Sequence, residues 1–252
     1  MKYIKIETLD QGLKIKVVSL NRPEVKNAFH PDMISEITQF FQHEGLRADL
    51  ILLKGEGTAF CAGADLNWMK SMVSFSRDEN LEDAKKLWSM FESIQACETP
   101  VVGIAHGAVF GGALGLLACC DYVIAEENTQ FCFSEVKLGL APAMISDFIS
   151  AKIPDAHFRA LMISAEVFNM ARSLQIGLVH RKFIGTIPDE QVVQIFGHNG
   201  TEAMKATKKL LNQLLQQKDL SKRRDLCADT IADRRMSAEG QSRLKEFLDK
   251  VK

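Results

Sequence analysis

The stretch GAVFGGALGLLACCDYVIAE, residues 107–126, places three glycines, Gly111, Gly112 and Gly115, in an apolar segment with no charged residue before Asp121. It follows a predicted strand, TPVVGIAHG, and opens a predicted helix. It is not a P-loop, because no Gly-Lys-Ser/Thr follows, and its order GGxxG differs from the dinucleotide-binding GxGxxG. Glycine lets a ligand approach the backbone closely. The stretch therefore predicts either backbone N–H groups that bind a small anion or a developing oxyanion, or a tight contact between helices.

A second loop, FCAGADLNWM, has the same character. It places Gly63 and Ala64 directly before a helix that is predicted to start at Leu66. Asp65 stands near that start, where aspartate stabilises a helix end. Two loops of small residues that each open a helix could each direct one backbone N–H to the same oxygen, which is the geometry of an oxyanion hole.

The composition limits the function classes. The 252 residues are 46% hydrophobic with a net charge of −1, which fits one large α/β domain or a domain with a small appendage. This charge balance predicts no nucleic acid or anionic membrane as partner. The six cysteines lack the spacing of a zinc site, so we expect no metal and reduced cysteines in a cytoplasmic protein.

The first residues, MKYIKIETLD, alternate as in a strand and do not resemble a signal peptide. The stretch from Thr99 to Cys120 contains no Asp, Glu, Lys or Arg and is long enough to span a bilayer. Pro100, its glycines and His106 argue against a membrane helix. His106, at the end of a predicted strand, is expected to be a hydrogen-bonded core histidine.

The pattern along the chain predicts strands over 3–8 and 13–20, a helix over 31–44 and a helix over 87–97. The polar segment 77–83 is expected to be mobile. The chain is mostly helical after Ala143, with amphipathic helices over 205–217 and 237–252. The basic stretches KATKKLL and SKRRD are expected to be solvated helix faces. These patterns predict an α/β core over residues 1–190 and a C-terminal helical region over 191–252.

Several stretches together resemble the crotonase (enoyl-CoA hydratase/isomerase) superfamily. They are LNRPEVKNAF, AFCAGADLNWM, PVVGIAHGAVFGGALGLLACCDYVIAEENTQFCFSEVKLGLAP, ALMISAEVFNMARSLQIGLVH and SAEGQSRLKEFLDK. The likeness is closest to bacterial methylglutaconyl-CoA hydratase-like members. It implies an α/β fold of the crotonase type, a spiral of ββα units with a helical C-terminal trimerisation region. It also implies a homotrimer or a dimer of trimers that acts on acyl-CoA thioesters, with coenzyme A as part of the substrate and no separate cofactor.

The resemblance implies a role for three residues at the reacting centre. Ala64 and Gly112 match the two backbone donors to the thioester oxygen. Glu135, in SEVKLGL, matches one of the two glutamates of the family's hydratases. The other glutamate falls three residues after Gly112, where this chain has Gly115.

The resemblance also implies a larger set that contacts the acyl group or coenzyme A: Lys26, Ala28, Ala62, Gly63, Asp65, Leu66, Trp68, Gly111, Gly115, Phe247 and Lys250. Phe247 and Lys250 are expected to reach coenzyme A across a subunit contact. The residue types allow other interpretations as well. Lys26 could be a solvated loop lysine, Trp68 a core residue, and Lys250 a cation that complements a helix end.

The missing glutamate affects the predicted reaction. Adding water across the 2,3 double bond needs a base for water and an acid for C2, whereas moving a double bond can proceed with one base. We expect a hydratase for enoyl-CoA thioesters with branched or carboxylated acyl groups, in fatty acid β-oxidation or branched-chain amino acid degradation. The alternatives are an enoyl-CoA isomerase with Glu135 as its single base, and a non-catalytic crotonase-fold binding or scaffold protein.

Overall fold

The computed structural model describes residues 1–185 and 189–250. Its main sheet has six strands in the order β1-β2-β3-β4-β6-β8, and a second sheet pairs β5 with β7. β1 and β2 form an antiparallel hairpin, and the remaining pairs are parallel. The strands are β1 (Ile4–Asp10), β2 (Lys14–Leu20), β3 (Leu50–Gly55), β4 (Val101–Ala105), β5 (Ala108–Phe110), β6 (Tyr122–Glu126), β7 (Gln130–Cys132) and β8 (Arg181–Phe183).

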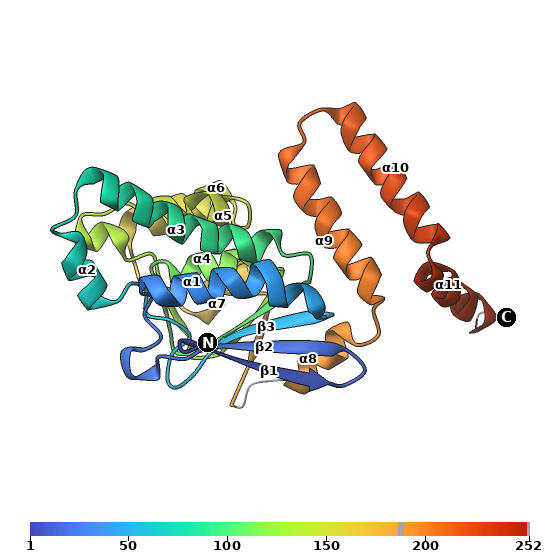
Figure 1. Cartoon of the computed structure of the whole chain (residues 1–252), viewed down its shortest axis with the longest axis horizontal. Helices are drawn as coiled ribbons and strands as arrows, with labels where there is room; N and C mark the ends of the chain where they lie inside the picture. Colours follow the sequence, from blue (N-terminus) through green and yellow to red (C-terminus); the bar gives the residue numbers. More distant parts are fainter. Residues whose placement is uncertain (186–188, 251–252) are drawn as a thin grey trace.

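Helices cover the main sheet and extend beyond it (Figure 1). The α-helices are α1 (Pro31–Gln39), α2 (Leu66–Met72), α3 (Arg77–Ala96), α4 (Ala113–Cys119), α5 (Ala143–Ser150), α6 (Asp155–Ser164), α7 (Met170–Gln175), α8 (Asp189–Phe196), α9 (Thr201–Gln216), α10 (Leu220–Met236) and α11 (Ala238–Lys250). A short 3-10 helix, η4 (Glu135–Leu138), precedes α5. Figure 1 shows α9, α10 and α11 projecting from the side of the molecule opposite α2. This arrangement confirms the predicted α/β fold with a C-terminal helical region.

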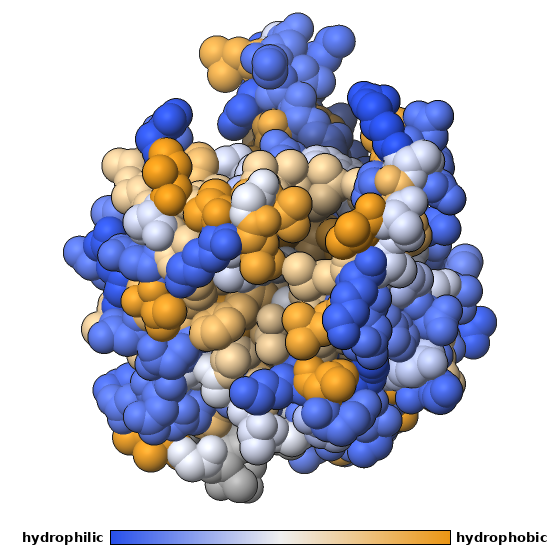
Figure 2. Space-filling view, turned by 90° about the vertical axis from the view of Figure 1, so that its left-hand side faces the viewer, coloured by the Kyte–Doolittle hydropathy of each residue, from blue (hydrophilic) through white to orange (hydrophobic). Residues whose placement is uncertain are grey.

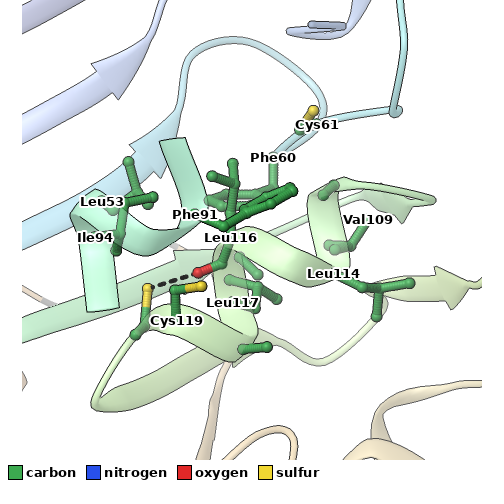
Figure 3. Packing of buried hydrophobic residues seen from close by; sticks show 14 of the residues in the cluster. Leu53, Phe60, Cys61, Phe91, Ile94, Val109, Leu114, Leu116, Leu117 and Cys119 are labelled. Carbon is green, nitrogen blue, oxygen red and sulfur yellow. Dashed lines mark hydrogen bonds between the residues drawn. The ribbon is translucent and has the colours of Figure 1, made fainter. Parts of the chain in front are cut away.

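The sheet separates two buried clusters because alternate strand residues point to opposite faces. Ile51 and Leu53 of β3 face α1, α3 and α4, while Leu50 and Leu52 face α8, where Val192 is fully buried. Figure 3 shows part of the first cluster, with Phe91 from α3 beside Leu116 of α4. The short helix α4 is thus buried along its whole length, which explains why its segment carries no charge.

The start of α3 differs from its prediction. Residues 77–83, expected to be mobile, form the first turns of α3. A capping box fixes this start: the Glu79 N–H donates to the Ser76 hydroxyl at 3.2 Å, and the Ser76 N–H donates to the Glu79 carboxylate at 2.7 Å. Ser76 and Glu79 have the S-x-x-E spacing of a capping box, which a prediction from polar composition alone does not take into account.

The C-terminal helices follow the prediction closely. The predicted helix over 205–217 is observed as α9, and the helix over 237–252 as α11, whose last two predicted residues lie outside the described part. The predicted division at 190/191 falls inside α8, and it stays a prediction. Within residues 1–185 and 189–250, no helix is long and apolar enough to cross a membrane. All six cysteines are free and five of them are buried.

The basic stretch KATKKLL is not wholly solvated, contrary to the prediction. The Lys208 side chain is only 5% exposed, and its ammonium group lies 2.8 Å from the carboxylate of Asp121. It also donates to the Thr99 carbonyl at 3.2 Å. The same Asp121 carboxylate accepts the Val101 N–H at 2.7 Å. Lys208 therefore attaches α9 to the start of β4.

Replacing Lys208 with Met should destabilise the protein, because the substitution leaves Asp121 without its cation. We expect the free energy of unfolding to fall by about 1–3 kcal/mol, less than for a fully buried pair because Asp121 keeps access to water. Urea denaturation measures this change. Lys209→Met is the matched control, since Lys209 is the exposed neighbour on the same helix. Equal losses in the two variants would contradict the role of the Lys208–Asp121 pair.

Candidate active site

Two backbone segments that are distant in sequence run side by side at the centre of the site. Cys61 and Val109 form a parallel bridge, in which the Cys61 N–H donates to the Ala108 carbonyl at 3.2 Å and the Phe110 N–H donates to the Cys61 carbonyl at 3.1 Å. The two small-residue loops that follow, residues 62–65 and residues 110–112, are therefore neighbours. The structure thus brings together the two loops that the sequence singled out.

Ala64 is held between two hydrogen bonds of its neighbours. The Phe29 N–H donates to the Gly63 carbonyl at 2.7 Å, and the Asp65 N–H donates to the Phe29 carbonyl at 2.8 Å. In such a parallel bridge the N–H of the middle residue points away from its partner strand. The Ala64 N–H accordingly has no acceptor among the described residues. Gly63 has φ +97°, and a Cβ there would lie 3.0 Å from the Phe110 carbonyl oxygen, so this position requires glycine.

Gly112 immediately precedes α4. Its neighbour Gly111 has φ +55° and donates its N–H to the Cys132 carbonyl at 2.8 Å. The Gly112 carbonyl accepts the Gly115 N–H at 3.0 Å, whereas the Gly112 N–H has no acceptor in the part of the chain that the structure describes. Both amide groups that the resemblance singled out, at Ala64 and Gly112, are thus free to donate.

Glu135 begins η4, which follows β7, so its side chain is brought next to the glycine cluster. Its Oε1 atom lies 3.5 Å from the point where a Cβ on Gly111 would be. Its Oε2 atom is buried and has no hydrogen-bond partner among the described residues. Burial raises the pKa of the Glu135 carboxyl group above its ordinary value, although a backbone N–H donor opposes the shift.

A carboxyl group with a raised pKa beside two free amide donors can support proton transfer next to a carbonyl group. The amide N–H groups would stabilise an oxygen that gains negative charge, and the carboxylate would accept or return a proton. The site is built largely from backbone groups and one acid. Within the described residues no cluster of three or more His, Cys, Asp or Glu side chains is placed to bind a metal ion.

Gly115 lies in a packing contact. A Cβ at this position would lie 2.5 Å from Cγ2 of Ile145 and 2.8 Å from the ring of Phe91. Phe91 and Ile145 are both almost fully buried. Of the two interpretations of the glycine cluster, the tight contact between helices therefore applies to Gly115. The backbone N–H group that is free to donate belongs to Gly112, in the loop before α4. The position at which the resemblance implies a second glutamate is therefore closed by apolar side chains.

The structure brings Lys26 close to the second loop, because the Ala62 N–H donates to the Lys26 carbonyl at 2.9 Å. Lys26 and Leu66 are exposed, and Ala28 is buried beside them. These residues form a rim beside Ala64. Trp68, the third residue of α2, is 7% exposed and packs in the main core.

Asp65 has both carboxylate oxygens occupied within the chain. Oδ1 accepts the N–H of Asn67 at 2.8 Å, and Oδ2 accepts a guanidinium N–H of Arg22 at 2.8 Å. Asp65 thus caps α2, as the sequence predicted. Arg22 was missed, because nothing in a spacing of 43 residues indicates an ion pair. The Nε2 N–H of His106 donates to the Gly57 carbonyl at 3.0 Å, as predicted for a hydrogen-bonded histidine, but the side chain is only half-buried and does not lie in the core.

Two of the predicted residues lie far from this centre. Phe247 and Lys250 belong to α11, at the end of the molecule opposite α2 (Figure 1). Phe247 is 62% exposed, and Lys250 pairs with Glu246 on its own helix. Within one chain they do not reach the site, so their role toward coenzyme A stays a prediction that needs a second subunit.

Residues 10–251 match the family model described as Enoyl-CoA hydratase/isomerase. The chain belongs to this family. It is 27% identical over 254 residues to the Crotonyl-CoA hydratase of Syntrophomonas wolfei, a match that covers 97% of this chain and 95% of that protein. A crystal structure of an enoyl-CoA hydratase from Shewanella pealeana is 34% identical, with a TM-score of 0.88 over 98% of this chain and 94% of that one.

A further relative in the family is Enoyl-CoA hydratase AKT6-1 of Alternaria alternata, 32% identical over 199 residues. That match covers 77% of this chain but 62% of the relative, so the chain spans less than two thirds of its length. The relatives support the crotonase fold and the family. They do not test the subtype expected from the sequence.

Substituting Gly115 with Ala tests the packing contact, because the contact determines whether the free energy of unfolding rises or falls. Alanine in a helix interior normally stabilises by about 1 kcal/mol relative to glycine. Here we expect a loss of about 1–3 kcal/mol, because the added methyl group meets Ile145 and Phe91. Thermal or urea unfolding measures this difference.

The double variant Gly115→Ala/Ile145→Ala serves as the control. Removing the Ile145 side chain should relieve the clash, so the two effects should not add. A stabilised Gly115→Ala variant, or strictly additive effects, would refute the contact.

Proposed function

We propose that the chain adds water across the 2,3 double bond of an enoyl-CoA thioester, with Glu135 as the one carboxyl group at the reacting centre. The observation that carries this proposal is the buried Oε2 of Glu135 beside Gly111, near the N–H groups of Ala64 and Gly112; none of the three has a hydrogen-bond partner among the described residues. A buried acceptor without a partner costs folding free energy, so a bound molecule is the natural source of its missing hydrogen bond.

In this mechanism the thioester oxygen accepts hydrogen bonds from Ala64 and Gly112, which draws electron density from C3. The Glu135 carboxylate takes a proton from a water molecule while the water oxygen bonds to C3. The electron pair of the double bond moves toward the thioester oxygen, where the two N–H groups stabilise the enolate. Glu135 then gives the proton to C2, so that the water is added completely and the carboxylate is restored.

Isomerisation is the second candidate, and the closed position at Gly115 favours it. Ile145 and Phe91 leave no room there for a second acid. Moving a double bond requires one base that carries a proton between C2 and C4, which a single glutamate can do. The relatives named hydratases support the first candidate. Product analysis separates the two: hydration removes the absorbance of crotonoyl-CoA, whereas isomerisation of a 3-enoyl-CoA creates it.

The substrate class is part of the proposal. The motif likeness to methylglutaconyl-CoA hydratases supports a branched or carboxylated acyl group in a cytoplasmic degradation pathway. Lys26, Ala62 and Leu66 would contact coenzyme A at the exposed rim. A scaffold protein without turnover remains the alternative of another class, and activity on a panel of enoyl-CoAs decides between them.

Assembly into a homotrimer or a dimer of trimers is also proposed. Figure 2 views the side on which α2 lies, where apolar residues gather in the middle of the face with hydrophilic residues around them. Further apolar side chains are exposed on the C-terminal helices, among them Leu215, Leu220 and Met236. Apolar surface of this kind supports contact with other subunits, and a second subunit would let Phe247 reach a site.

Replacing Glu135 with Gln should lower kcat by about 10²–10⁴-fold, because the amide cannot take the proton from water. Affinity for the CoA ester should change little, since size and hydrogen bonding are retained. Steady-state kinetics on the best enoyl-CoA measures both. Glu127→Gln is the control, because Glu127 forms a surface ion pair with Lys182. Full turnover by Glu135→Gln would exclude Glu135 as the base.

The pH profile should reflect the raised pKa of Glu135. Only the ionised carboxylate can accept a proton, so kcat/KM should fall as the pH decreases through the pKa of the free enzyme. Because burial raises this pKa, the midpoint should lie above the ordinary value of 4.5. A midpoint at or below 4.5 would contradict the environment assigned to Glu135.

The oligomeric state has a direct test in light scattering. We expect a mass of three or six chains at neutral pH, because the exposed apolar residues of the C-terminal helices would be covered in the assembly. Leu220→Asp and Met236→Asp should weaken the assembly by placing charges in that contact, while Lys209→Met should not. A wild-type protein with the mass of one chain would refute the proposed assembly.

A further inference from the structure

We propose that Arg22 is a positioning residue for the thioester site, which holds the Ala64 N–H in place through Asp65 and the Ala28 carbonyl. The inference rests on the proposed function, in which the Ala64 N–H binds the thioester oxygen. Arg22 does not touch the substrate in this proposal. It acts through the backbone pairing that presents Ala64.

The guanidinium group of Arg22 lies across that pairing. Nη1 donates to the Ala28 carbonyl at 2.7 Å, and Nη2 donates to the Asp65 carboxylate at 2.8 Å. Ala28 directly precedes Phe29, and Asp65 directly follows Ala64, while Phe29 and Ala64 are the bridged pair. One planar group with fixed donor directions therefore joins the two strands of the bridge beside the free N–H.

The Asp65 end of this link is itself fixed. Its side chain is 7% exposed and that of Arg22 is 14% exposed, so water competes little for the pair. The other carboxylate oxygen of Asp65 accepts the N–H groups of Asn67 and Trp68, at 2.8 Å and 3.3 Å. Burial alone would raise the pKa of Asp65, but Arg22 and these amides outweigh it and hold the pKa below its ordinary value. Asp65 thus stays ionised and remains an acceptor for Arg22.

The Arg22 end is fixed by Asn27, which is fully buried. The Asn27 side-chain carbonyl accepts the backbone N–H of Arg22 at 2.8 Å, and its amide group donates to the carbonyls of Glu56 and Ala59, both at 2.8 Å. Asn27 has φ +55°, a backbone conformation in which asparagine is tolerated better than most residues. This polar network ties residues 22–29 to residues 56–65 independently of apolar packing.

Position matters here because two N–H groups from different loops must converge on one oxygen. Misplacing a reacting or stabilising group by about 1 Å can cost about 100-fold in rate. Without the guanidinium group, Asp65 loses its cation and the Ala28 carbonyl loses its donor. The pairing of Phe29 with Ala64 would then be held by backbone hydrogen bonds alone, and the Ala64 N–H would sample more directions.

The test compares Arg22→Met with Lys208→Met in the full-length protein. Each variant removes the cation of an ion pair and leaves a carboxylate behind, but Lys208 attaches α9 and has no contact with either loop. Both are assayed below their unfolding temperatures on the best enoyl-CoA substrate. Hydrogen exchange of the peptides that contain residues 60–68 is measured in parallel, without substrate.

We expect Arg22→Met to lower kcat about 10–100-fold with a much smaller change in KM, because the lost interaction acts on the transition state. Exchange at 60–68 should become faster. Lys208→Met should keep kcat within about twofold, although it is destabilised. Arg22→Lys should recover part of the loss, since it retains the charge but not both hydrogen bonds.

Two outcomes would overturn the inference: unchanged kcat and unchanged exchange in Arg22→Met, or equal losses of kcat in Arg22→Met and Lys208→Met. A wild-type protein that turns over no enoyl-CoA would refute the proposed function instead. The exchange comparison would still decide whether Arg22 holds the Ala64 loop, because it needs no substrate.

Discussion

The candidate site depends on backbone pairing between three segments that are distant in sequence. Phe29 pairs with Ala64, and Cys61 pairs with Val109, each in a short parallel bridge. These pairings use the N–H and C=O groups on either side of Ala64 and leave its own N–H free. They also set the loop before Gly112 alongside, with Glu135 brought in by the pairing of β5 with β7. The geometry of the site therefore follows from which backbone groups are hydrogen-bonded to one another. Small residues are needed wherever two of these segments approach closely.

The hydrogen bonding of the buried polar groups distinguishes the residue proposed to react from those that stabilise the structure. Asp65, Asn27 and Lys208 are buried polar residues whose groups find partners within the chain. Glu135 differs, because one of its carboxyl oxygens is buried without a partner among the described residues. Trp68, His106 and Arg234 each also have one buried nitrogen without a partner among the described residues, but none of them is an acid beside the glycine cluster. The unsatisfied carboxyl oxygen of Glu135 costs folding free energy, and it lies near amide groups that are free to donate. This combination is expected where a substrate supplies the missing hydrogen bonds.

The sequence predicts much of this arrangement, and its limits have physical causes. Alternation and helical period identify the strands and the amphipathic C-terminal helices, because one buried face imposes its period on local sequence. The two small-residue loops and Glu135 are also found from sequence, although their roles stay proposals. The contacts of Gly115 with Phe91 and Ile145, and the ion pair of Arg22 with Asp65, could not be predicted. They join residues from separate elements, and the residue types alone do not specify which partner folding brings near.

The central claim is that the N–H groups of Ala64 and Gly112 donate to one thioester oxygen. The most direct measurement is the infrared difference spectrum of butyryl-CoA, labelled with carbon-13 at its thioester carbonyl and bound to the wild-type protein. This saturated ester cannot be hydrated, so the bound state is stable. Two converging donors should weaken the carbonyl bond and shift its stretching band to lower frequency than in water, with a narrower band. A carbonyl band of the bound ester with the same position and width as that of the free ester in water would contradict the account.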